Sequence, residues 1–114
     1  MLNVHLYMLQ RITALIMAPL TFGHIAVMIY AVQDGLTVSE ILSRTQGSIS
    51  WFMFYGSFVV AVSIHAAIGV RVISFEWGKV KGRLLDMLTW IIFVVLLWLG
   101  GRAVIAVTFA EGGL

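Results

Sequence analysis

Two histidines lie inside long apolar stretches of the sequence, where an ionisable side chain is costly and is therefore a candidate for function. His24 lies in the first stretch and His65 in the second. A neutral imidazole nitrogen is a good ligand for haem iron, and a b-type haem needs only histidine ligands and a cleft lined by small residues. The alternative for His65 is a structural histidine bonded to a hydroxyl on another helix. His5 is expected to be solvated.

The two histidines are expected at different depths in the membrane. At 1.5 Å per residue, His24 lies roughly 20 Å along its helix from Arg11, whereas His65 lies roughly 9 Å from Arg71. If both arginines mark the same interface, the histidines are poorly placed to bind one iron. His24 is therefore either the ligand of a second haem or a structural histidine.

The arginines near the helix ends have two interpretations. Arg11 and Arg71 are expected at the cytoplasmic interface. A guanidinium matches the two oxygens of a carboxylate, so either arginine could hold a haem propionate, and the alternative is snorkelling to lipid headgroups. Arg102 is expected to snorkel at the opposite interface. No aspartate or glutamate lies deep in a stretch, which argues against a proton-coupled transporter.

The elements that must position these residues are transmembrane helices. Of the 114 residues, 61% are hydrophobic and 11% are charged, which is too apolar to cover a small soluble domain. Three stretches are long enough to cross a bilayer as helices. We predict a single all-α membrane-anchor domain over residues 1–114, running up-down-up. The helices are expected at about 6–32, 48–75 and 83–110, with a short helical turn at 37–43 opened by a capping-box pattern.

Basic residues predict the orientation of the helices. The segment after the second stretch carries Arg71, Lys79, Lys81 and Arg83, whereas the segment after the first carries only Arg44. The positive-inside rule then places the N-terminus in the cytoplasm and the C-terminus on the opposite side. A net charge of +2 with scattered basic residues does not suggest a nucleic-acid partner. The absence of cysteine excludes disulfides and a covalently attached c-type haem.

Small residues suggest a close contact along the second helix. Ser57, Ala61, His65 and Gly69 recur one turn apart, and such a stripe lets another helix or a flat ligand approach closely. Three helices make a thin bundle, so we expect a partner chain. Pro19, inside the first helix, is expected to kink the helix and not to end it.

Two runs of residues resemble a known family. The run LQRITA at 9–14, followed by APL at 18–20, resembles the start of helix I in the small membrane-anchor subunits of succinate dehydrogenase (complex II). The run HAAIGVR at 65–71, with an acidic–aromatic pair at 76–77, resembles their helix II. The resemblance covers nearly the whole chain and implies packing with a homologous anchor subunit.

The resemblance also implies roles for individual residues. His65 matches the axial ligand of haem b, the second ligand coming from the partner anchor. Arg11 matches the arginine near the propionates and the quinone pocket, and Glu76 and Trp77 match the pair beside that pocket. Arg71 matches an arginine of the longer anchor type.

Other positions depart from either anchor type. Trp77 replaces a quinone-binding tyrosine of the shorter type, and Tyr7 replaces a serine of the longer type, so the signature is mixed. The pair of Gly23 and His24 resembles the helix I ligand of anchors that carry two haems. One haem b is therefore expected, or two if His24 is also a ligand.

The implied activity is electron transfer and not catalysis by this chain. FAD and iron–sulfur clusters would belong to a flavoprotein and an iron–sulfur subunit, and quinone would be the substrate, at the cytoplasmic membrane of a bacterium. The direction of the reaction, succinate oxidation or fumarate reduction, depends on the other subunits. Two alternatives are a cofactor-free structural or assembly subunit and a small dimeric transporter.

Overall fold

The computed structural model describes residues 3–109, and within that range every regular element is a helix. Its elements are α1 (Val4–Asp34), α2 (Val38–Thr45), α3 (Ile49–Glu76) and α4 (Gly82–Thr108). This confirms the all-α prediction, and the three long helices begin and end within two residues of the predicted bounds. The predicted end of the third helix, at residue 110, lies outside the described residues.

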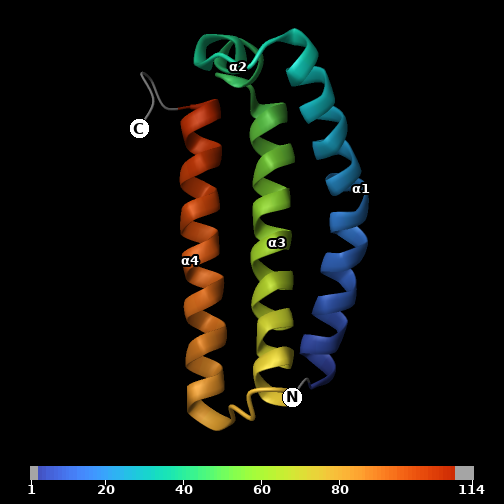
Figure 1. Cartoon of the computed structure of the whole chain (residues 1–114), viewed down its shortest axis with the longest axis vertical. Coiled ribbons are helices and arrows are strands. Elements are labelled where there is room, and N and C mark those ends of the chain that lie inside the picture. The colour runs from blue at the N-terminus through green and yellow to red at the C-terminus, as the bar shows by residue number, and fades with distance from the viewer. Residues whose placement is uncertain (1–2, 110–114) are drawn as a thin grey trace.

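The three long helices lie side by side and alternate in direction, with α3 in the middle (Figure 1). Both α1 and α4 pack against α3, and α2 packs against α4. Each long helix has the length and apolar composition to cross a membrane. At 1.5 Å per residue each spans roughly 40 Å or more, against roughly 30 Å of hydrocarbon. The chain is therefore a multi-pass membrane protein, with many large apolar side chains exposed on its outer faces.

Helix α1 begins at a side-chain cap and continues through its proline. The side chain of Asn3 accepts a hydrogen bond from the Leu6 N–H at 2.9 Å, which satisfies one of the unpaired donors of the first turn. Pro19 lies inside the helix, as predicted, and α1 is curved where the other long helices run straighter (Figure 1).

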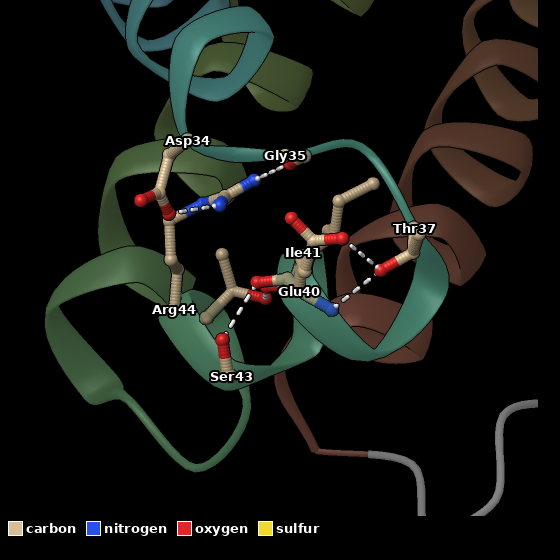
Figure 2. Close-up of polar contacts among 8 residues, drawn as sticks. Asp34, Gly35, Thr37, Glu40, Ile41, Ser43 and Arg44 are labelled. Atoms are coloured by element: carbon tan, nitrogen blue, oxygen red, sulfur yellow. Dashed lines mark hydrogen bonds and ion pairs between the residues drawn. The ribbon is translucent and has the colours of Figure 1, made fainter.

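The short helix α2 extends the predicted turn by two residues at its C-terminal end. Thr37 is its N-cap, and the Thr37 hydroxyl accepts from the Glu40 N–H at 3.2 Å and donates to the Glu40 carboxylate at 2.6 Å. Arg44 ties α2 back to the end of α1, through an ion pair with Asp34 at 2.6 Å and a bond to the Gly35 carbonyl at 2.9 Å (Figure 2). The capping signal predicted this start correctly.

The other end of α2 is fastened to the end of α4. The Thr45 hydroxyl donates to the Val107 carbonyl at 2.6 Å, and the Gly47 N–H donates to the Thr108 carbonyl at 2.5 Å. These bonds satisfy two of the last carbonyls of α4, which have no partner within the helix. Helix α2 therefore closes one end of the three-helix layer.

Helices α3 and α4 approach closely because small residues line their contact. A Cβ atom added to Gly100 would lie 2.6 Å from a methyl carbon of Val59. Ser63 is 1% exposed, and its hydroxyl donates to the Val59 carbonyl at 2.7 Å, so this buried hydroxyl is paired. Close backbone approach of this kind is how transmembrane helices associate without a hydrophobic driving force.

Candidate functional site

His65 faces α1 and has a hydrogen-bond partner there. Its Nδ1 atom lies 3.2 Å from the hydroxyl oxygen of Thr13, which is 3% exposed. The same hydroxyl lies 2.8 Å from the Leu9 carbonyl and 3.0 Å from the Gln10 carbonyl. Within residues 3–109, no hydrogen bond is found for the other ring nitrogen, Nε2. One ring nitrogen of His65, Nδ1, is thus hydrogen-bonded to Thr13, and the other, Nε2, remains available to a ligand.

The small-residue stripe of α3 turns out to contact α1 of the same chain. Ala61 is 4% exposed beside Thr13, and a Cβ added to Gly69 would lie 3.7 Å from the side-chain nitrogen of Gln10. Ser57, at the start of the stripe, is exposed. The stripe therefore brings α1 close enough for the Thr13–His65 bond, while Ser57 stays exposed.

His24 has surroundings of a different kind. Its ring lies 5.4 Å from that of Phe58 and 6.2 Å from that of Tyr55, centroid to centroid. Its Nδ1 atom is buried, and the described residues offer it no hydrogen-bond partner. The side chain lines a cavity of about 310 Å³ that Gly100 and Val104 of α4 also line and that α2 borders.

The two histidines lie at different depths, as the sequence predicts. His65 is level with Thr13 on α1, because their side chains are in hydrogen-bond range. His24 lies about three turns farther along α1, roughly 16 Å at the rise of an α-helix. One iron cannot reach both side chains within a single chain. Each histidine can serve only its own site.

Arg71 pairs with a residue to which the sequence analysis assigned no role. Its Nη1 atom lies 2.8 Å from a carboxylate oxygen of Asp86 and 3.2 Å from the Thr89 hydroxyl, both on α4. The Arg71 side chain is 16% exposed, and its Nε atom is buried without a partner in the described part of the chain. The arginine therefore links α3 to α4 through Nη1, and within the described residues its Nε and Nη2 donors make no hydrogen bond.

The other predicted site residues lie near the same end of the layer. Arg11 makes a 3.3 Å bond to the Tyr7 hydroxyl, with the guanidinium 5.7 Å from the centre of the tyrosine ring. Glu76 ends α3 and Trp77 follows it as the C-cap, 83% exposed. Unlike Arg71, these side chains are exposed, so they could meet a ligand or another subunit.

The chain can supply single ligands but not a complete metal site. Among residues 3–109, no three His, Cys, Asp or Glu side chains come together as a metal-binding group. Haem brings its own ring nitrogens and needs only axial ligands from protein, so a lone histidine suits it. The second axial ligand would have to come from another chain.

Two of the residues at this site could have been found from the sequence. A threonine in an apolar helix commonly bonds the carbonyl four residues back, which leaves its oxygen available to a neighbour such as His65. Asp86 lies just past the short α3–α4 connection, so the antiparallel pairing of these helices brings it alongside Arg71. The aromatic neighbours of His24, Tyr55 and Phe58, carry no comparable signal.

Comparison with known families agrees with this architecture. The family model described as "Succinate dehydrogenase/Fumarate reductase transmembrane subunit" matches residues 1–107. No curated protein and no solved structure matches the sequence. A match over nearly the whole chain, on three helices able to span a membrane, shows that the chain belongs to the family of succinate dehydrogenase/fumarate reductase transmembrane subunits.

Proposed function

We propose that this chain is one of two membrane anchors of a succinate:quinone oxidoreductase, and that His65 supplies an axial ligand to haem b. The observation that carries the proposal is the arrangement of His65. One ring nitrogen is bonded to a hydroxyl of the neighbouring helix, and the other makes no hydrogen bond within residues 3–109. Ligating histidines in proteins are held in this way, with the second ring nitrogen bonded to a supporting group.

The two helices that carry Thr13 and His65 also carry arginines that could hold the propionates of a haem group. Haem, when bound, supplies one-electron chemistry between the iron–sulfur subunit and quinone. Arg11 is the better partner for a propionate, because it is exposed and bonded only to an uncharged phenol. Arg71 already pairs with Asp86 and Thr89 through Nη1, so within the described residues only its Nε and Nη2 donors remain. We propose Arg11 as the main propionate partner and Arg71 as a secondary one.

The quinone site is proposed near the end of the layer that carries the α3–α4 connection. Arg11, Glu76 and Trp77 are exposed there. Arginine and the indole N–H can donate to a quinone carbonyl, and a carboxylate in contact with water can pass a proton to the reduced quinone. We propose that this end lies on the cytoplasmic side of a bacterial inner membrane, because basic residues in the connection favour the cytoplasmic side. There the iron–sulfur and flavoprotein subunits, carrying the iron–sulfur clusters and FAD, would dock.

A second haem at His24 is the second candidate. It is favoured by the buried Nδ1 atom without a partner and by the cavity next to it. A buried nitrogen without a hydrogen bond is unfavourable, and a ligand or a group from the partner anchor would remove that cost. The separation from His65 along α1 requires a separate haem.

A cofactor-free anchor is the main alternative, and the hydrogen bond between Thr13 and His65 is the observation that supports it. In that case the bond would only stabilise the contact of α1 with α3. Hydrogen bonds between transmembrane helices contribute about 0.6 kcal/mol on average. That gain is small beside the cost of placing an ionisable residue in a membrane. We therefore favour the haem ligand.

The proposal is tested by purifying the intact complex through a tag on this chain. A reduced-minus-oxidised spectrum should show a b-type α band, and a flavoprotein should co-purify. A complex with the flavoprotein and without the band would leave the anchor role and remove the haem. A preparation without any flavoprotein would overturn the assignment to an oxidoreductase.

A further inference from the structure

Thr13 lies where α1 meets His65, and its hydroxyl contacts three groups at once. The oxygen is 2.8 Å from the Leu9 carbonyl, 3.0 Å from the Gln10 carbonyl and 3.2 Å from Nδ1 of His65. We propose that Thr13 is a positioning residue that sets the tautomer of His65, keeping the ring proton on Nδ1 and the lone pair on Nε2. The inference rests on the proposed role of His65 as a haem ligand.

Counting protons leads to this tautomer. A threonine hydroxyl has one proton to donate and lone pairs with which to accept. The two nearest acceptors of that proton are the Leu9 and Gln10 carbonyls, both closer than the imidazole. When the proton points to either carbonyl, the oxygen can only accept from His65. Nδ1 must then carry the hydrogen, and Nε2 has none.

The opposite arrangement would disable the ligand. If the Thr13 hydroxyl donated to Nδ1, a neutral imidazole would carry its hydrogen on Nε2, which could not then bind iron. Thr13 is 3% exposed, so the bond is shielded from competing groups outside the chain. Because the Thr13 hydroxyl donates to a carbonyl of its own helix, it selects the tautomer in which Nε2 of His65 has a lone pair.

The position also favours threonine sterically. In a helix the threonine rotamer is restricted, and one preferred rotamer directs the oxygen to the carbonyls three and four residues back. Bonds to the Leu9 and Gln10 carbonyls show Thr13 in that state. Thr13→Val keeps the shape and removes the oxygen, whereas Thr13→Ser keeps the oxygen. These two variants separate the hydrogen bond from the packing.

The tautomer can be measured without haem. The full chain is labelled with ¹⁵N-histidine in lipid bilayers, with His5→Gln and His24→Gln so that only His65 gives a signal. Protonated and unprotonated ring nitrogens differ in ¹⁵N chemical shift, and we expect Nδ1 protonated and Nε2 unprotonated. Thr13→Val should abolish this preference and Thr13→Ser should preserve it. A proton on Nε2 in the chain that retains Thr13 would overturn the inference.

The second measurement uses the intact complex. Removing a supporting hydrogen bond from a ligating histidine weakens metal binding by about 10–100-fold. We therefore expect Thr13→Val to lose haem by about that factor on titration with a competing haem acceptor, and to shift the iron–histidine stretching band. Thr13→Ser should remain close to the unmodified complex. Thr21→Val, on the same helix and without a bond to a histidine, is the matched control.

The two proposals fail in different ways. If the unmodified complex contains no haem, the proposed role of His65 fails, while the nitrogen shifts still decide the tautomer. If the complex contains haem and Thr13→Val changes neither its retention nor the stretching band, the inference about Thr13 fails and the haem role stands. If Thr13→Val does not insert or fold, the ¹⁵N chemical shifts of His65 in the unmodified chain and in Thr13→Ser still show which ring nitrogen carries the proton.

Discussion

His65 and His24 occupy contrasting sites on the same pair of helices. The ring of His65 is hydrogen-bonded across α1 and α3, whereas Nδ1 of His24 is buried among aromatic rings without a partner in the described residues. A buried nitrogen left unbonded costs about 1–3 kcal/mol. The chain therefore completes the support of His65 by itself. The described residues offer no group that offsets this cost at His24.

The largest effect is expected from removing each histidine in turn. We predict that His65→Ala abolishes the b-type α band of a complex with one haem, because the alanine offers no iron ligand and the contact of His65 on α1 is a threonine. His24→Ala should leave the band intact if the complex holds one haem. The haem-to-protein ratio from a pyridine haemochrome assay measures both variants.

Other outcomes of the same assay sharpen the comparison. Loss of half the haem in each variant would assign a second haem to His24. Full retention of haem in His65→Ala would contradict the proposed ligand. His5→Ala is the control, since His5 is exposed near the start of α1.

A smaller effect is expected where α4 approaches α3 beside the cavity of His24. A Cβ added to Gly100 would lie 2.6 Å from a methyl carbon of Val59, a stiff β-branched side chain. We predict that Gly100→Ala destabilises the chain. The steric clash costs about 1–3 kcal/mol, and the higher helix propensity of alanine offsets about 1 kcal/mol of that cost. Unfolding in mixed micelles by added dodecyl sulfate, followed by circular dichroism, measures the change.

The neighbouring glycine provides the matched control. A Cβ added to Gly101 meets no described atom within 4 Å, so Gly101→Ala should be neutral or stabilising. Combining Gly100→Ala with Val59→Ala should restore much of the lost stability by removing the clashing methyl groups. If Gly100→Ala were as stable as Gly101→Ala, the result would contradict the close contact of Gly100 with Val59.

The helices could be predicted from the sequence because lipid imposes simple rules. Apolar length set the spans, and the Thr37–Glu40 pattern marked the start of α2. The prediction that His65 could bond a hydroxyl on another helix is also met, by Thr13. That bond satisfies only one nitrogen, so it is compatible with a haem ligand.

The details of the site depended on helix rotation, which hydropathy does not determine. Helices apolar on every side show no preferred inner face, so the sequence could not say that the stripe at Ala61 and Gly69 meets α1 of the same chain. Aromatic packing around His24 depends on the same rotation. The sequence therefore predicted which residues matter better than it predicted their neighbours.

The smallest effect is expected at α2, which borders the cavity of His24 through Ile41 and Thr45. Thr37→Ala removes the N-cap hydroxyl and its two bonds to Glu40. Loss of such a cap lowers helix stability by about 1 kcal/mol, which corresponds to about a fivefold larger population of the open first turn. Amide hydrogen exchange of the α2 residues in lipid bilayers measures this opening.

The control for α2 is Ser39→Ala, an exposed position of the same helix whose side chain makes no hydrogen bond in the described structure. It should leave exchange nearly unchanged. Because α2 is also bonded to α4 through Thr45, only its first turn should open in Thr37→Ala. Faster exchange throughout α2 would show instead that the cap holds the whole helix over the His24 cavity. The haem proposed at His65, whose partner Thr13 lies about three turns from His24 along α1, should be retained in either case, which would make the two histidine sites energetically separable.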